Sequence, residues 1–135
     1  MTILPTHTCF DDALEFLNAI LKYEGVERLL GVRVVHGICL APEGVQIGQP
    51  FAHAWCEEDG SCIQAGLVEG EKVYFGVDRA EFYAMLRPQD TTTYTPEEAV
   101  AQNFASGHFG PWEDRYRAII KHGDRTVFEG ESPCA

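Results

Sequence analysis

Residues 51–68, which read FAHAWCEEDGSCIQAGLV, set the fold that we expect for this chain. Two segments of mainly apolar residues flank Asp59-Gly60, a dipeptide typical of the tight turn of a β-hairpin. In the first segment Phe51, His53 and Trp55 occupy alternate positions, so they would lie on one face of a strand. We therefore predict that this stretch forms an antiparallel hairpin.

Further strand patterns lie on both sides of this hairpin. They predict four sequential strands, at residues 32–40, 51–57, 61–68 and 72–77, and a last edge strand at residues 125–128. Turn-forming residues separate the first four strands, so we expect neighbouring strands to pair antiparallel.

A long helix is predicted before the first strand, over residues 9–24. Apolar residues recur there at helical spacing and form one stripe: Phe10, Ala13, Leu14, Leu17, Ile20 and Leu21. Thr8 stands where an N-cap is expected, and Asp11 and Asp12 place negative charge in the first turn. This helix should pack its stripe on the sheet.

Two more helices are predicted after residue 78. Residues 78–87 have helical character and end before Pro88. Thr95-Pro96-Glu97-Glu98 combines an N-cap, a proline at the first position and a glutamate at the third, so a helix should run from there to about Ser106.

These elements predict one α+β domain over residues 1–135, with residues 129–135 as a flexible tail. Its long N-terminal helix would pack on a mostly antiparallel sheet, and the extra helices would follow at the C-terminal end. The order of one early helix and then hairpins also permits a cystatin-like wrap of a sheet around a single helix.

Composition restricts the partners. The formal net charge of −11 and the pI near 4.7 disfavour binding to nucleic acid or to an anionic membrane. A basic protein partner would suit this charge, although solubility alone also explains it. No apolar run reaches the roughly 18 residues that cross a bilayer, and the first residues do not resemble an export signal.

The five cysteines indicate a cytoplasmic protein. They are Cys9, Cys39, Cys56, Cys62 and Cys134. Their number is odd and their spacing shows no disulfide framework, so we expect free thiols in a reducing compartment.

Cys9 and His53 are the residues that most suggest chemistry. Cys9 opens the predicted first helix, where backbone N–H groups and the helix dipole stabilise a thiolate. His53 lies in the middle of a strand between two aromatic residues, and its ring nitrogens need partners. A cysteine and a histidine far apart in sequence can meet in space as nucleophile and base. Each residue alone would also fit a buried structural position.

The order of these features resembles the core of the transglutaminase-like branch of the papain-like superfamily. A cysteine opens a long helix, a strand follows, and then come His-Ala-Trp-x-Glu, Asp-Gly and a third strand, together residues 8–68. The resemblance implies that Cys9 is the nucleophile and His53 its base. The family's orienting aspartate would fall near Gln64, which can orient a histidine but cannot balance an imidazolium as a carboxylate does.

Two functions follow as expectations. The first is a cysteine-dependent amide hydrolase or acyl transferase that acts on a small-molecule or peptide amide, with Cys9, His53 and Gln64 at its centre. Glu57 or Asp59 could replace Gln64 as the orienting residue. The second is a non-catalytic binding or accessory module on a degenerate papain-like core.

The remaining candidates concern binding rather than catalysis. Trp55, His108 and Trp112 are predicted to line a substrate cleft, because Gly107–Trp112 is dense in glycine and aromatic residues. No cofactor is expected. No metal site is expected either, since His53 and Cys56 would point to opposite faces of one strand. His36 is interpreted as a core residue of the first strand.

Overall fold

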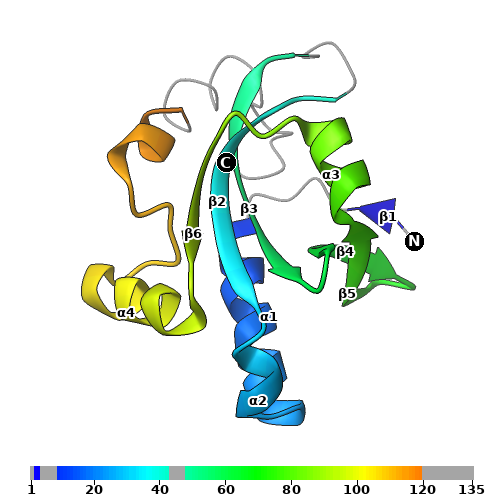
Figure 1. The fold of residues 1–135 in the computed structure, drawn as a ribbon, viewed down its shortest axis with the longest axis vertical. Coiled ribbons are helices and arrows are strands. Elements are labelled where there is room, and N and C mark those ends of the chain that lie inside the picture. The colour runs from blue at the N-terminus through cyan, green and yellow to red at the C-terminus, as the bar shows by residue number, and fades with distance from the viewer. Residues whose placement is uncertain (1, 4–8, 43–47, 120–135) are drawn as a thin grey trace.

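The structure is a computed structural model that describes residues 2–3, 9–42 and 48–119. Its elements follow in the order β1 (Thr2–Ile3), α1 (Cys9–Tyr23), α2 (Val26–Leu29), β2 (Arg33–Leu40), β3 (Pro50–Glu58), β4 (Ser61–Val68), β5 (Glu71–Asp78), α3 (Arg79–Leu86), β6 (Asp90–Tyr94) and α4 (Pro96–Ser106) (Figure 1). Residues 114–119 are also helical. The α+β class is therefore confirmed.

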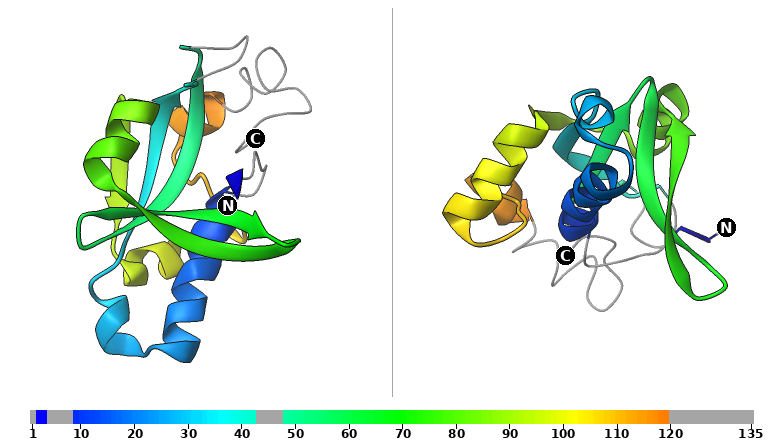
Figure 2. Two further views of the ribbon diagram at one scale, coloured as in Figure 1. Left: turned by 90° about the vertical axis from the view of Figure 1, so that its right-hand side faces the viewer. Right: turned by 90° about the horizontal axis from the view of Figure 1, so that it is seen from below.

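The strands of the described residues form one antiparallel sheet in which β3 is flanked by β2 and β4. β2 pairs with β3 along its whole length, and β6 pairs with the other edge of β2. β4 pairs with β3 only over Ser61–Ile63, beside the Asp59-Gly60 turn, and then pairs with β5. The β4–β5 hairpin consequently crosses the direction of β2 and β3 (Figure 2, left).

The turn between β3 and β4 has the backbone that the sequence predicted. Asp59 has φ 48° and Gly60 has φ 77°, so both central residues take the left-handed conformation. Two such residues in a row define the hairpin turn whose twist matches that of the strands, and Asp-Gly tolerates it.

Two apolar clusters lie on opposite faces of the sheet. The α1 face of the sheet buries Phe10, Ala13, Leu14, Leu17, Ile20, Val34, Ala52, Ala54 and Cys56. The opposite face, covered by α3, buries Val35, Cys39, Phe51, Trp55, Cys62, Phe82 and Leu86. Successive residues of β3 alternate between these two clusters, as the pleat of a strand requires.

Small residues let α1 approach β3 closely. Ala52 and Ala54 face the helix, and the Cys56 thiol donates a hydrogen bond of 3.3 Å to the Ala13 carbonyl. The prediction of a long N-terminal helix packed on a mostly antiparallel sheet is thus confirmed. The resemblance to a papain-like core is a finer statement that this packing does not test.

The helices after residue 78 are also confirmed. Asp78 caps α3 by accepting hydrogen bonds from the Ala80 and Glu81 amides. Thr95 and Glu98 form the reciprocal capping box predicted at the start of α4, with Pro96 in its first turn. The sequence analysis missed β6, because a short polar strand at a sheet edge has no apolar alternation to reveal it.

Several expectations fall outside the described residues. They are the N-cap Thr8, Cys134, the edge strand 125–128 and the tail 129–135. Among the described residues, no helix is both long enough and apolar enough to cross a membrane.

Candidate functional site

His53 lies on the α3 face of the sheet and is nearly buried. Its ring centroid is 5.6 Å from those of Phe51 and Trp55 and 6.2 Å from that of Phe82 in α3. Burial among these aromatic rings lowers the pKa of His53 to about 4, so the imidazole is neutral at pH 7.

Gln64 is the hydrogen-bond partner of His53 that the sequence predicted. Both side chains are buried, and the Gln64 side chain forms a hydrogen bond that favours the protonated form of His53 and so partly offsets the effect of burial on its pKa. The expected contact between these two residues therefore exists, whereas a catalytic role for it stays a prediction.

Glu57 binds Trp55 and two side chains of α3 rather than His53. Its carboxylate accepts hydrogen bonds from Trp55 Nε1 at 2.8 Å, from the Tyr83 hydroxyl at 2.5 Å and from Arg79 Nε at 2.9 Å. Burial alone would raise the pKa of Glu57, but these donors hold it below its ordinary value. Glu57 is thus engaged with Trp55, Arg79 and Tyr83, and an orienting role for Gln64 stays a prediction.

Cys9 lies on the other face of the sheet. It opens α1 and is buried in the cluster of the α1 face, together with Ala52, Ala54 and Cys56. His53 points away from that cluster because alternate residues of β3 face opposite sides. The predicted Cys9–His53 pair therefore needs a correction, since the sheet separates the two side chains.

The state of the cysteines also differs from the expectation. Cys39, Cys56 and Cys62 are free and buried, but Cys9 is disulfide-bonded. Burial raises the pKa of all three free thiols, that of Cys62 to about 12. The prediction of free thiols thus holds for these three cysteines and is wrong for Cys9.

His36 is the histidine on the α1 face. It is fully buried, and the rings of Phe10, Trp112, Tyr94 and Tyr116 surround it with centroids at 4.7, 4.8, 5.1 and 6.4 Å. Neither ring nitrogen has a hydrogen-bond partner among the described residues. His36 is thus the core residue that the sequence predicted, but its ring nitrogens find no hydrogen bond within the described ranges.

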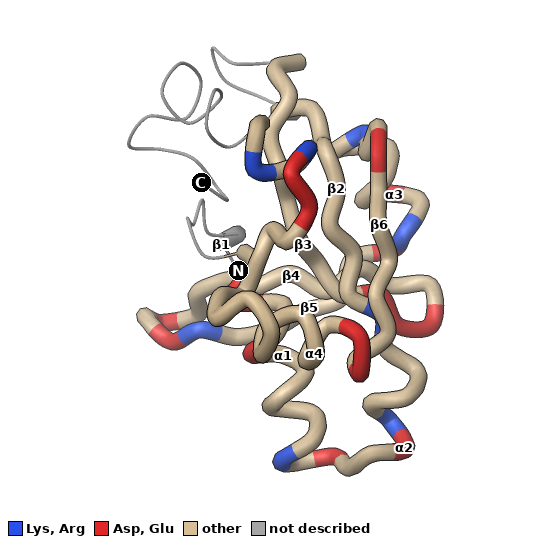
Figure 3. Tube along the Cα trace, turned by 90° about the vertical axis from the view of Figure 1, so that its left-hand side faces the viewer, with Lys and Arg blue, Asp and Glu red and all other residues tan. Residues whose placement is uncertain are grey.

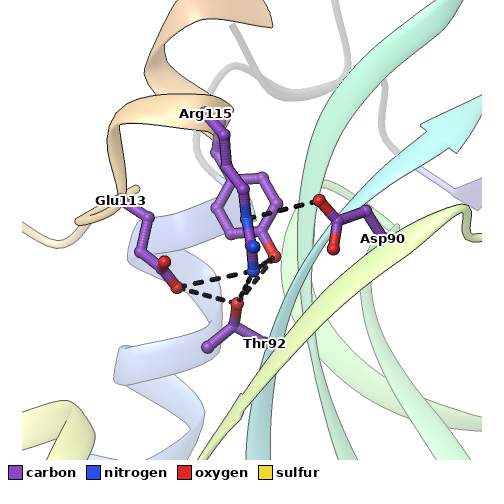
Figure 4. A network of polar contacts seen from close by, with 5 residues as sticks. Asp90, Thr92, Glu113 and Arg115 are labelled. Carbon is purple, nitrogen blue, oxygen red and sulfur yellow. Dashed lines mark hydrogen bonds and ion pairs between the residues drawn. The ribbon is translucent and has the colours of Figure 1, made fainter.

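A polar network beside His36 anchors the segment that covers it (Figure 4). The Thr92 hydroxyl shares a hydrogen bond of 2.7 Å with the Tyr116 hydroxyl and donates one of 2.8 Å to Glu113. The Arg115 guanidinium binds Thr92 and Tyr116 and pairs with Asp90 at 3.3 Å. These contacts fix residues 113–116 to β6.

The three residues predicted to line a cleft do not form one. Trp55 is buried under α3, whereas Trp112 packs on His36 on the opposite face of the sheet. His108 is exposed, and its ring accepts a hydrogen bond of 3.1 Å from the Gly110 amide. The grouping of Trp55 with Trp112 therefore needs a correction, because the sheet lies between them.

Exposed apolar side chains form a feature that the sequence analysis did not single out. Eight large hydrophobic residues are exposed in the described part of the chain, and six belong to α4 or to the segment that ends α1 and contains α2. These six are Leu21, Tyr23, Val26, Leu30, Val100 and Phe104, and we call their surface the helical end. Phe104 is 90% exposed and Tyr23 is 72% exposed.

One part of the helical end, α4, contacts the helix α1 of the other part. Arg33 donates a hydrogen bond of 2.9 Å to the Leu30 carbonyl. The capping hydrogen bonds with Thr95 are the main cause that lowers the pKa of Glu98, and the positive charge of Arg33 lowers it further. α4 lies beside α1, whereas α2 lies beyond the C-terminal end of α1 (Figure 1). A sequence signal existed in Val100 and Phe104, which lie one helical turn apart.

Comparisons with known proteins add no identification, since no family model, curated protein or solved structure matches this chain. Within the described residues, no group of three or more His, Cys, Asp and Glu side chains could hold a metal ion.

Proposed function

We propose that this chain is a non-catalytic protein-binding module and that its helical end contacts a basic partner protein. The observation that carries the proposal is that α4 exposes Val100 and Phe104, while residues 21–30 expose four more large apolar side chains. Single exposed apolar residues are normal on a protein surface, but two that share one face of a helix, as Val100 and Phe104 do, favour an interaction site.

α4 supplies the strongest part of this surface. Of its eleven residues only Pro96 and Ala99 are buried, so most of the helix faces solvent. Val100 and Phe104 stand four residues apart and thus share one face. An aromatic side chain as exposed as that of Phe104 suits the anchor residue of an interface, since aromatic residues often contribute much of the binding energy.

Charge favours a basic partner over a second copy of this chain. The formal net charge of −11 makes two copies repel each other. α4 carries Glu97 and Glu98 and has no lysine or arginine, whereas on α2 Arg28 balances Glu27 (Figure 3). A partner with an apolar anchor site and lysines or arginines around it would complement both features.

Catalysis by a transglutaminase-like core stays a prediction from the order of residues 8–68. The separation of Cys9 from His53 by the sheet gives it no support. The binding module is the function that the described contacts favour.

Site-specific photocrosslinking tests the proposal. The photoreactive amino acid p-benzoylphenylalanine would replace Phe104 in one variant and Val68 in a control variant, in cells of the source organism. Val68 is also an exposed apolar residue, but it lies on β4, outside the helical end.

The expected result is one dominant adduct at position 104, absent at position 68, with a protein of high isoelectric point. Purified, that protein should bind the wild-type chain with an affinity that falls as salt rises. An adduct between two copies of this chain, equal labelling at both positions, or no adduct would overturn the proposal.

A further inference from the structure

Residues 107–112 connect α4 to the anchored segment 113–116, and we call them the lid. Gly107 ends α4 with φ 78°, and Gly110 has φ 118°, so both glycines adopt backbone conformations that other residues rarely take. The lid lies directly on His36: a Cβ atom added at Gly110 would be 2.8 Å from His36 Cε1.

The lid buries a polar ring without satisfying it. Both nitrogens of His36 lack hydrogen-bond partners in the described part of the chain, while Gly110 and Trp112 cover the ring. A buried polar group without a hydrogen bond destabilises the arrangement that buries it. The closed lid is therefore held by the aromatic contacts and by the network at Thr92, against the unmet hydrogen bonds of His36.

Among the described residues, no charged group of the surrounding elements raises the pKa of His36. The charged and titratable groups of these elements are Asp11 and Asp12 on α1, Asp90 and Tyr94 on β6, His108 in the lid, and Glu113, Arg115 and Tyr116 after it. Burial is the one cause that lowers the pKa of His36, to about 3. Among the described residues, an imidazolium in the closed lid would have no carboxylate partner.

We propose that the lid opens when His36 takes up a proton from solvent, and that this opening releases the C-terminal end of α4. The proton binds the ring nitrogen that carries none, and the resulting imidazolium needs hydration at both N–H groups. Moving Gly110 and Trp112 aside supplies that hydration. The lid starts at the C-cap of α4, so its movement changes the position of Phe104, three residues earlier.

The expected effect of lid opening on docking rests on the proposed function, because Phe104 belongs to the proposed docking surface. Acidification would thereby weaken docking at the helical end. Opening of the lid can nevertheless be measured without any partner.

The experiment uses fluorine NMR of the full chain labelled with 5-fluorotryptophan. The two tryptophans report separately, since Trp112 lies in the lid and Trp55 lies under α3. As the pH falls from 7 to 4, the Trp112 resonance should move to a solvent-exposed position before the Trp55 resonance changes, because His53 beside Trp55 has a pKa lowered to about 4. The transition midpoint should fall between the ordinary histidine pKa of about 6.5 and the lowered value in the closed lid.

Two variants assign the transition. His36→Leu should abolish the Trp112 transition, whereas His108→Asn, which keeps an acceptor for the Gly110 amide, should retain it. In the wild type, the ¹³Cε1 shift of His36 should titrate together with Trp112, a readout that remains if His36→Leu does not fold. If both tryptophan resonances changed at the same pH, or if the Trp112 transition survived in His36→Leu, the proposed opening of the lid would be wrong.

Amide hydrogen exchange of residues 103–106 tests the link to α4. After correction for the intrinsic pH effect, exchange should accelerate at least about 10-fold across the Trp112 transition. An unchanged rate would overturn the link to α4. Photocrosslinking at position 104 at pH 7 tests docking alone, so failure of the lid and failure of the proposed function are distinguishable.

Discussion

Replacement of Glu57 by glutamine tests how α3 is held on the sheet. One carboxylate oxygen accepts from both Trp55 Nε1 and the Tyr83 hydroxyl, and the other accepts from Arg79. The side chain of Glu57 is 18% exposed and that of Arg79 is 54% exposed. Glu57→Gln keeps an acceptor for the two ring donors but removes the charge.

The expected magnitude follows from these contacts. Hydrogen bonds to a charged acceptor contribute about 1 kcal/mol more than neutral ones, and two of them are weakened in Glu57→Gln. The exposed ion pair with Arg79 adds about 0–1 kcal/mol. We expect a loss of about 2 kcal/mol in the free energy of unfolding for Glu57→Gln. Glu57→Ala should lose about 3–5 kcal/mol, because it leaves two donors without an acceptor.

The effect should depend on pH in a defined direction. The pKa of Glu57 is lowered in the folded chain, so the stability it contributes is present above its ordinary value of about 4.5. That contribution disappears as the pH falls through the lowered pKa, and the difference between wild type and Glu57→Gln should shrink accordingly.

Urea unfolding followed by circular dichroism at pH 7 and at pH 4 measures both quantities, with the exposed Glu71→Gln as a matched control. A loss below about 0.5 kcal/mol for Glu57→Gln, no larger than that of the control, would refute the reasoning. So would a Glu57→Ala variant no less stable than Glu57→Gln.

Three further predictions concern the buried histidines, the lid and the cysteine. Folded-state pKa values of about 3 for His36 and about 4 for His53 lie below the unfolded value of about 6.5. The free energy of unfolding should therefore be highest above pH 6.5. Below pH 6.5 it should fall by up to about 1.4 kcal/mol per pH unit for each histidine, until that histidine is protonated in the folded chain as well. Urea unfolding from pH 8 to pH 5 measures this, and a free energy of unfolding that does not change with pH would contradict the prediction. Gly110→Ala should destabilise the chain by more than about 1 kcal/mol and expose Trp112 at pH 7, because the new Cβ meets His36 at a strained φ; an unchanged melting temperature would contradict the close contact. After reduction, Cys9 should react with iodoacetamide no faster at pH 6.5 in wild type than in His53→Ala; a rate that falls in the mutant would revive the cysteine–histidine pair.

Local signals in the sequence were sufficient for most of the fold. The Asp59-Gly60 turn, the apolar stripe of α1 and the capping box at Thr95 each depend on neighbouring residues, so the pattern identifies them. β6 escaped because its pairing with β2 depends on a distant strand rather than on its own residues.

The candidate site was harder to predict because it depends on which face of the sheet the helix covers. Alternation placed Phe51, His53 and Trp55 together correctly, and the family resemblance placed Gln64 near His53. Alternation could not tell whether α1 packs on that face or on the opposite one. The small side chains of Ala52 and Ala54 favour close approach of a helix, and this packing signal places Cys9 away from His53.

Titration of the crosslinked basic partner into the wild-type chain and into Phe104→Ser, followed by calorimetry, tests the central claim most directly. The variant changes an exposed side chain, so it should fold as the wild type does. Docking at the helical end predicts a dissociation constant at least about 10-fold higher for Phe104→Ser than for wild type. Equal dissociation constants for the two proteins would contradict it.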